Sequence, residues 1–371
     1  MTLMPFAWIR GLSGGLRPLR ALVARGWLRE SDVDAWLALL HPALRLSRVM
    51  ARVTARQWVA DDMLALTLRA NGNWRGALPG QHVQLYLERN GVRLSRSYSL
   101  TALRPDGSLE IAIKRQVGGR VSPYLLEHLA VGELLELGPV YGELSWPEQA
   151  QGLLLLAAGS GITPLLGLLR TALAQGFSAP VSLLHYVREQ GQRAFVAELQ
   201  ALQAQYANVQ VRWSLSAAPA DASQLQGRFC VEHLADITGL AQRSVLACGP
   251  AGFVAQVQQW WQGANQVGGL QYEAFTPPAL QLDSQRREVR LGFARSHWVA
   301  PADNQRSLLE QAEAQGLTPA HGCRQGICAS CTCTLLSGTV RDLRSGLLFS
   351  EPGQPIRLCV SAPHTDVEID L

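Results

Sequence analysis

The spacing of hydrophobic and polar residues divides the chain into four segments. In the first segment apolar residues recur at helical spacing, and in the second they recur at every other position. Residues 1–47 have the pattern of short helices, and a capping pair of Ser31 and Asp34 is expected to begin one of them. Over residues 48–147 the period falls to two, in short runs such as His82–Leu87 that are separated by turn sequences. Short strands at even spacing predict a small antiparallel β-barrel.

The last two segments have longer apolar runs and a different order of elements. In residues 148–276, continuous apolar runs at Leu153–Ala158 and Val181–Val187 are each followed by a helical pattern. Strands that alternate with helices predict an open α/β domain with a parallel sheet. Thr276-Pro277-Pro278 predicts a stiff linker, and residues 280–371 then combine strands, one helix and a cysteine-rich loop.

The charge of the chain is concentrated near its N-terminus. The 371 residues include 33 basic and 29 acidic side chains, a net charge of +4. Residues 1–50 hold seven arginines and three acidic residues, so the rest of the chain is neutral. This excess is too small for a nucleic-acid-binding face, and we exclude that class of partner. No apolar run is long enough to cross a membrane, and arginines interrupt any signal sequence, so we expect a cytoplasmic protein.

Cysteines supply the most specific chemical signal in the sequence. The chain contains seven, and four of them crowd into the eleven residues that end at Cys333. A set with the spacing of plant-type [2Fe–2S] ligands is Cys323, Cys328, Cys331 and Cys359. The alternatives are a zinc loop and inert buried cysteines. Structural zinc sites usually use paired Cys-x2-Cys units, and inert cysteines need no glycine-rich loop such as that with Gly322 and Gly326. We therefore predict an iron–sulfur cluster on these four thiolates and interpret Cys333 as a small buried side chain.

Three other motifs are suited to binding phosphates or a planar ring. Gly159, Gly161 and Thr163 lie between a buried strand and a helix, where backbone amides can hold a pyrophosphate; a tight strand–helix turn is the alternative. Gly118–Pro123 precedes another helix and is either a phosphate loop or a plain cap. In Arg96–Ser99 the arginine can bind a phosphate, the tyrosine can cover the face of a planar ring, and a serine can form a hydrogen bond to a ring nitrogen. The alternative is that this segment only ends a strand.

The order of these motifs resembles the ferredoxin–NADP reductase family with a fused plant-type ferredoxin. The resemblance covers residues 48–371 and includes Cys248-Gly249-Pro250 at the end of a later strand. It implies an FAD-binding β-barrel, an NAD(P)-binding α/β domain and an α+β ferredoxin domain of the β-grasp type. The segment Gly118–Pro123 looks like the FAD-type loop, so we expect FAD; reductases with FMN share this domain order.

The resemblance also implies roles for individual residues. The implied flavin contacts are Arg96 on the diphosphate, Ser97, Tyr98 on the ring and Ser99 near N5, with Gly119, Val121 and Ser122 along the phosphates. The implied nicotinamide contacts are Gly159, Gly161 and Thr163, with Cys248 near the hydride path and Glu273 and Phe275 near the isoalloxazine. Ser99, Cys248 and Glu273 are thus the candidate catalytic residues. Arg188 and Arg193 either hold a 2′-phosphate, which favours NADPH over NADH, or are solvated loop charges.

These parts predict a reductase that passes electrons from NAD(P)H through a flavin to the cluster and on to an iron-containing acceptor. The helical extension carries Trp8, Trp27 and Trp36 among its arginines. Such an extension is similar to that of bacterial reductases serving membrane fatty acyl desaturases, so we hypothesise a membrane di-iron desaturase or hydroxylase as acceptor. Residues 1–48 would then contact the inner face of the membrane, or else only pack on the barrel. The alternatives are the reductase of a soluble ring-hydroxylating oxygenase and a redox-sensing module.

Overall fold

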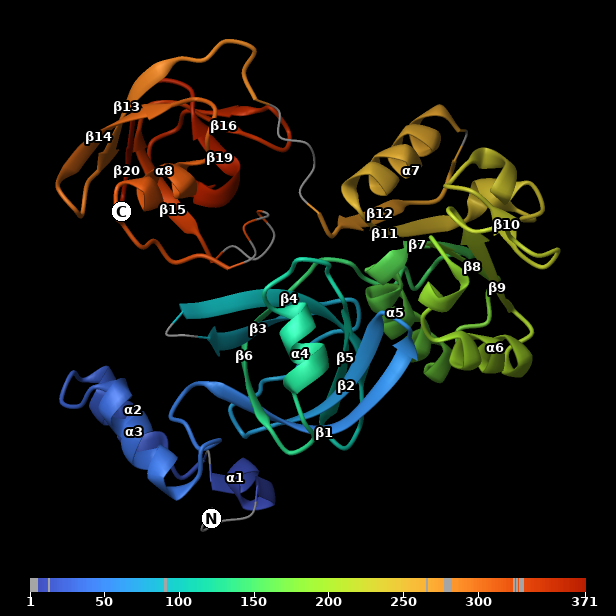
Figure 1. Ribbon diagram of the computed structural model, residues 1–371, viewed down its shortest axis with the longest axis horizontal. Helices are drawn as coiled ribbons and strands as arrows, with labels where there is room; N and C mark the ends of the chain where they lie inside the picture. The colour runs from blue at the N-terminus through green and yellow to red at the C-terminus, as the bar shows by residue number, and fades with distance from the viewer. Residues whose placement is uncertain are drawn as a thin grey trace. The chain divides into compact units, whose positions relative to one another are not determined.

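The computed structural model confirms a multidomain protein with an antiparallel barrel, a parallel sheet and an α+β domain (Figure 1). It describes residues 6–12, 14–89, 92–264, 266–276, 282–322, 324, 326 and 330–371. The chain forms two compact units, residues 1–275 and 276–371. The finer domain boundaries drawn from the sequence remain predictions.

The barrel is a closed six-stranded sheet in the order β1-β2-β5-β4-β3-β6, with every pair antiparallel. Its strands are β1 (Val49–Ala60), β2 (Met63–Ala70), β3 (His82–Arg89), β4 (Val92–Leu103), β5 (Ser108–Lys114) and β6 (Leu134–Tyr141). Helix α4 (Ser122–His128) packs Leu125 and Leu126 into the barrel core. Because the inward positions of each strand are apolar, the predicted period of two produces one continuous core.

The second domain is a six-stranded parallel sheet in the order β10-β9-β8-β7-β11-β12. Its strands are β7 (Leu153–Ala158), β8 (Val181–Val187), β9 (Val209–Leu215), β10 (Leu225–Gln226), β11 (Ser244–Gly249) and β12 (Leu270–Ala274). Helices α5 (Ile162–Ala174) and α6 (Val196–Gln205) cover one face, and α7 (Ala251–Gly263) covers the other (Figure 1). Burial of both faces explains the unbroken apolar runs of the central strands.

The N-terminal extension forms three helices, α1 (Phe6–Leu12), α2 (Arg17–Ala24) and α3 (Glu30–Leu40). Their buried residues make a small core that packs on the barrel through Met50 and Leu134. Asn71 and Asn73 fasten this junction, because their side-chain amides donate to backbone carbonyls of residues 43–48 at 2.9–3.1 Å. The extension therefore packs on the barrel, as one of our two alternatives required.

The predicted capping pair at the start of α3 is wrong. The helix begins at Glu30, and no side chain caps its first turn. Ser31 lies inside the helix, and Asp34 is buried, where it accepts hydrogen bonds from the amide of Leu46 at 2.7 Å and the guanidinium of Arg48 at 3.0 Å. Two hydrogen bonds, one of them from a charged guanidinium, stabilise a buried carboxylate more than a single bond to a helix cap would. Asp34 therefore fixes the position of the segment that follows the helix.

A buried ionic network joins the barrel to the parallel-sheet domain. Arg170 of α5 donates to the carbonyl of Thr101 and to Glu110 of β5, each at 2.7 Å. The same guanidinium binds both carboxylate oxygens of Glu198 in α6, each at 2.5 Å. Burial opposes ionisation of Glu110, but the charge and hydrogen bonds of Arg170 outweigh it and hold the pKa of Glu110 below its ordinary value. The two domains of residues 1–275 are therefore locked together.

Loss of Arg170 is expected to destabilise this junction strongly. Arg170→Ala leaves Glu110 buried without its main partner, which costs about 3–5 kcal/mol. Because the folded-state pKa of Glu110 is lowered, its stabilisation is present above the ordinary value of 4.5 and is lost as the pH falls through the lower folded-state value. Thermal unfolding followed at pH 7 and between pH 5 and pH 3 tests both points, and the variant should lose much of the acid dependence. Arg212→Ala removes only a pair with the exposed Asp236 and should cost no more than about 1 kcal/mol.

Residues 276–371 form the α+β unit. Its five-stranded sheet has the order β14-β13-β20-β15-β18, and a three-stranded sheet has the order β17-β16-β19. The elements are β13 (Glu288–Phe293), β14 (Trp298–Asp303), α8 (Leu308–Ala314), β15 (Thr332–Ser337), β16 (Val340–Asp342), β17 (Leu348–Phe349), β18 (Pro355–Arg357), β19 (Ser361–Pro363) and β20 (Val367–Ile369). Ser307 and Glu310 form a reciprocal capping box that begins α8. Among the described residues, every helix is too short or too polar to cross a lipid bilayer.

Candidate redox site

The predicted pyrophosphate loop lies between β7 and α5 and is packed against the end of β11. Gly159–Gly161 form a single 3-10 turn, and Gly159 has the left-handed φ of 55°. A Cβ atom at Gly161 would lie 1.9 Å from the carbonyl oxygen of Cys248, so only glycine fits there. The hydroxyl of Thr163 donates to the carbonyl of Ser160 at 2.9 Å and is used within the loop. The structure thus brings the glycine loop and Cys248 into backbone contact.

Two residues that sequence reasoning missed support this loop. His185 of β8 is fully buried, and its Nε2 lies 2.9 Å from the carbonyl oxygen of Gly159. Burial lowers the pKa of His185 to about 4, so the ring is neutral at physiological pH and donates to that carbonyl. The amino group of Lys114 lies 3.3 Å from where a side chain at Gly159 would begin. Lys114 is the only lysine in the chain, and this rarity is the sequence feature that could have marked it as a candidate functional residue.

Cys248 and Glu273 are paired across two parallel strands. They occupy the same register position of β11 and β12, and the amide of Phe275 donates to the carbonyl of Gly249 at 2.8 Å just beyond it. Cys248 is fully buried. Burial, and then the nearby carboxylate of Glu273, raise the pKa of the Cys248 thiol well above its ordinary value. Cys248 therefore presents a neutral thiol rather than a reactive thiolate.

The carboxylate of Glu273 also reaches the barrel. Its Oε1 lies 3.3 Å from Nδ1 of His82, the first residue of β3. His82 is buried and stands opposite Ser99 in the β3–β4 register, so Ser99, His82, Glu273 and Cys248 form one continuous series of neighbours. Sequence reasoning missed His82, because a single histidine at a strand start has no local signal. The three candidate catalytic residues are thus brought to one place.

The predicted flavin-binding run Arg96–Ser99 lies in the second half of β4. Ser99 is buried, Tyr98 is half-buried, and the guanidinium of Arg96 is exposed and donates to the carbonyl of Ser95 at 2.6 Å. Burial raises the pKa of Tyr98, so its hydroxyl stays protonated. The hydroxyl oxygen of Ser97 is buried without a hydrogen-bond partner among the described residues. A buried hydroxyl without a partner fits a strand that receives a bound polar group.

The predicted flavin-phosphate loop is a tight turn before α4. Gly119 donates its amide to the carbonyl of Gln116 at 2.9 Å, and the hydroxyl of Ser122 accepts from the amide of Gln116 at 3.0 Å. Val121 is buried in the barrel core. These contacts fix the turn, while the roles of its residues on a flavin remain predictions.

Arg188 and Arg193 lie in the loop after β8. The side chain of Arg188 is exposed, and its carbonyl accepts the amides of Ala217 and Ala218 at 2.9 and 3.1 Å. The guanidinium of Arg193 lies over the ring of Trp213, 5.7 Å from the ring centroid. Arg188 is exposed and Arg193 is half-buried, and neither forms an ion pair within 4 Å among the described residues, although the charge of Arg193 helps to lower the pKa of Asp221.

Two of the four predicted cluster ligands are described, and the structure brings them together. Cys331 and Cys359 are both buried, and their Sγ atoms lie 3.2 Å apart without a disulfide between them. The amide of Leu358 donates to the carbonyl of Cys331 at 3.1 Å, which ties the two segments. Cys323 and Cys328 lie outside the described residues. Converging buried thiols fit an iron–sulfur cluster, which requires deprotonated sulfur ligands at close spacing.

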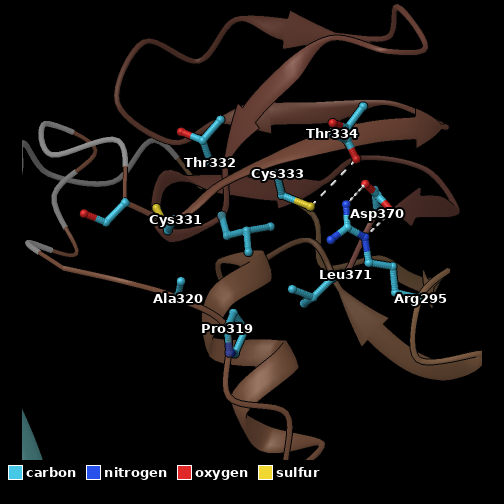
Figure 2. Close-up of a pocket in the computed structure, with 11 residues that line it drawn as sticks. Arg295, Pro319, Ala320, Cys331, Thr332, Cys333, Thr334, Asp370 and Leu371 are labelled. Atoms are coloured by element: carbon cyan, nitrogen blue, oxygen red, sulfur yellow. Dashed lines mark hydrogen bonds and ion pairs between the residues drawn. The ribbon is translucent and has the colours of Figure 1, made fainter. Parts of the chain in front are cut away.

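A cavity of about 210 Å³ lies beside Cys331 (Figure 2). Its wall includes Cys333, whose thiol points toward the carbonyl of Thr334 at 3.8 Å, and the ion pair between Arg295 and Asp370 at 2.5 Å. Cys333 is buried in β15. This agrees with its interpretation as a small buried side chain rather than a ligand.

Family models match all three domains of the chain. They are the oxidoreductase FAD-binding domain over residues 50–146, the oxidoreductase NAD-binding domain over residues 155–259 and the 2Fe-2S iron-sulfur cluster binding domain over residues 295–364. The match supports FAD, a pyridine nucleotide and a [2Fe–2S] cluster as cofactors, and with the paired thiols it favours iron–sulfur over zinc.

Curated relatives and solved structures share this domain order. An NADPH oxidoreductase of Mycobacterium tuberculosis is 31% identical over 345 residues, covering 91% of this chain and 88% of the relative. A putative reductase subunit of a toluene-4-sulfonate monooxygenase system from Comamonas testosteroni is 30% identical over 324 residues, covering 84% of this chain and 95% of the relative. The structure of phthalate dioxygenase reductase aligns with a TM-score of 0.58 at 23% identity, over 87% of this chain and 98% of that one, and supports the fold. The chain therefore belongs to the ferredoxin reductase family of oxidoreductases, and it carries FAD-binding, NAD-binding and [2Fe–2S] domains in one polypeptide.

Proposed function

We propose that the protein is the reductase component of an oxygenase system. When bound, FAD accepts a hydride from NAD(P)H and releases single electrons, which the [2Fe–2S] cluster carries to the oxygenase. The observation that carries the proposal is the convergence of Cys331 and Cys359, at 3.2 Å, in a chain that also has a glycine loop packed on Cys248. The relative named as a monooxygenase reductase subunit supports an oxygenase as acceptor more than it supports a membrane desaturase.

Different residues of the chain are proposed to position the flavin and the nucleotide. Arg96 and the turn at Gly119–Ser122 are proposed to hold the flavin diphosphate, and Tyr98 to cover the ring. Gly159 and Gly161 are proposed to let the nucleotide pyrophosphate approach the backbone of the loop. The amino group of Lys114, which pairs with Asp62 at 3.4 Å, lies beside Gly159. Ser99 and Cys248 supply a hydroxyl and a neutral thiol where the two rings would meet.

We further propose a preference for NADPH over NADH. Arg188 is exposed and Arg193 is half-buried at the edge where an adenosine 2′-phosphate would lie, and Arg188 has no ion pair among the described residues. A guanidinium binds a phosphate by two parallel hydrogen bonds and gains nothing comparable from a ribose hydroxyl. The relative named as an NADPH oxidoreductase supports the same choice.

Anaerobic stopped-flow spectroscopy of the holoprotein tests the proposal. Mixing with NADPH should bleach the flavin absorbance first and the cluster absorbance second, and kcat/KM should be higher with NADPH than with NADH. Sustained turnover with cytochrome c as acceptor separates a reductase from a redox sensor, which would stop after one reduction. Flavin bleaching without cluster reduction would contradict the proposed electron path.

A membrane desaturase or hydroxylase is a second candidate acceptor, because the extension exposes large apolar side chains and is rich in arginine. Trp27, Trp36 and Leu39 are 72%, 57% and 81% exposed, and the last two share one face of α3. Tryptophan and arginine together are typical of helices that lie in a membrane interface. The Mycobacterium tuberculosis relative matches part of this extension too, since the unmatched tenth of the chain is shorter than residues 1–47.

Sedimentation with lipid vesicles separates the two candidates. Full-length protein should bind vesicles containing phosphatidylglycerol better than pure phosphatidylcholine vesicles. The variant Trp27→Ser/Trp36→Ser/Leu39→Ser should bind at least about tenfold less, because each buried large side chain contributes roughly 1.5–3 kcal/mol. Trp58→Ser is the matched control, since Trp58 is 51% exposed but lies on the barrel strand β1. Equal sedimentation of all three proteins would remove the membrane candidate.

A further inference from the structure

Two arginines from different strands converge on one backbone carbonyl of the cysteine-rich loop. Arg344 follows β16, and its Nη1 donates to the carbonyl of Gly326 at 3.3 Å. Arg357 ends β18, and its Nη1 donates to the same oxygen. Gly326 stands between the predicted ligands Cys323 and Cys328 in the sequence. The two guanidiniums therefore share one acceptor, on a residue that lies between two of the predicted ligands in the sequence.

The backbone at Gly326 is shaped for this contact. Its φ is +73°, a conformation that favours glycine. A Cβ atom there would lie 2.8 Å from a methyl group of Val360 and 3.1 Å from the guanidinium carbon of Arg344. Gly326 is thus packed against Arg344 and Val360 without room for a side chain.

The charges around the carbonyl do not balance within the described residues. Asp342 is buried and binds Arg344, with Nη2 to Oδ2 at 3.1 Å and its other oxygen accepting the Arg344 amide at 2.8 Å. Arg357 has no carboxylate partner in the described part of the chain. Two like charges that share one acceptor repel each other, and a single carboxylate offsets only one of them. One positive charge therefore has no carboxylate partner among these residues, and it would stabilise an anionic group placed beside it.

A [2Fe–2S] cluster on four thiolates is such a group, because its net charge is negative in both oxidation states. Arg357 stands two residues before the ligand Cys359, and between them the amide of Leu358 binds the carbonyl of Cys331. Gaining an electron makes the cluster more negative by one charge. A fixed cation nearby stabilises the reduced form more than the oxidised form, and so raises the reduction potential.

We propose that Arg344 and Arg357 form a cationic clamp on Gly326 that positions the cluster loop and raises the reduction potential of the cluster. The proposal rests on the proposed function, since it presupposes the bound cluster. Both are positioning residues: they act on the cluster through the loop carbonyl and through their charge. The clamp makes the cluster a better acceptor for the single electron that the flavin releases.

Redox titration of the purified holoprotein, followed by the EPR signal of the reduced cluster, tests the clamp. Arg357→Gln is the informative variant, because it removes a charge and strands no carboxylate. It should lower the equilibrium constant for cluster reduction about tenfold. For a one-electron couple this corresponds to a reduction potential lower by about 59 mV. Arg357→Lys keeps the charge and should retain most of the potential. Arg290→Gln, which removes an exposed arginine paired with Asp366 in the same unit, should leave the potential unchanged.

The results distinguish an electrostatic effect of Arg357 on the cluster from a purely structural role of its side chain. An unchanged potential in Arg357→Gln, or a shift of equal size in Arg357→Lys, would overturn the clamp while the unaltered protein still showed its cluster. If Arg357→Gln loses the cluster, as measured by iron and sulfide per chain, then Arg357→Lys must restore both cluster content and potential, and failure to do so also overturns it. Absence of a [2Fe–2S] signal from the unaltered protein would instead refute the proposed function.

Discussion

Cys359→Ser is expected to reduce NADPH-driven cytochrome c reduction by roughly 100-fold or more, because changes even in groups behind the ligands cost 10–100-fold in metal sites. Cys359 is buried, and its Sγ lies 3.2 Å from that of Cys331, so a hydroxyl there removes one of the four predicted ligands and breaks up the pair of thiols. Reduction of ferricyanide should persist, since this small acceptor takes electrons directly from the flavin. Steady-state rates with both acceptors, together with iron content, measure the effect.

Cys333→Ser is the matched control for this prediction. Cys333 is a buried cysteine of the same core, on β15 two residues after Cys331, but its thiol faces the carbonyl of Thr334 rather than the ligand pair. Its replacement should keep the cluster and the cytochrome c activity. The ligand assignment would be wrong if Cys359→Ser kept a full cluster, or if Cys333→Ser lost it.

The second large effect is expected at the nucleotide loop. Gly161→Ala places a methyl group 1.9 Å from the carbonyl oxygen of Cys248, so the loop and the end of β11 must move apart. Forced overpacking of this kind costs about 1–3 kcal/mol, and a displacement of about 1 Å at reacting groups can lower a rate by about 100-fold. We expect a raised KM for NADPH and flavin reduction slowed by about that factor. Stopped-flow flavin reduction at several NADPH concentrations measures both quantities.

Gly252→Ala is the control for Gly161→Ala. Gly252 lies at the start of α7, close to Cys248 in sequence, and nothing lies within 4 Å of a Cβ atom placed there. Alanine in a helix is favoured over glycine by about 0.5–1 kcal/mol, so this variant should be active and slightly more stable. If both variants lost hydride transfer, then general disturbance of the domain rather than the close contact at Gly161 would be the cause.

The sequence was sufficient for those features that depend on local pattern. The period of two predicted the barrel, the unbroken apolar runs predicted the parallel sheet, and cysteine spacing predicted the cluster domain; the structure and the family matches confirm all three. Each of these signals can be recognised within a short stretch of sequence. Strand alternation, burial of both faces of a sheet and a curled ligand loop all depend on residues that are close together in the chain.

Contacts between distant segments were not predictable in this way. The local rule for helix caps misplaced Asp34, whose partners Leu46 and Arg48 come from the chain after the helix. His82 meets Glu273 only because the barrel and the parallel sheet pack together. No periodicity encodes such a meeting, and a lone histidine or arginine has the same local appearance in a binding site as on a surface.

The division of the chain at Phe275 and Thr276 has a kinetic consequence. The amide of Phe275 still binds Gly249 in the nucleotide domain, and the unit that carries Cys331 and Cys359 begins at the next residue. A tether this short keeps the two units at an effective concentration in the mM range, far above that of any separate ferredoxin in dilute solution. Transfer between them is then a first-order event within one molecule, and its rate per chain does not depend on how dilute the protein is.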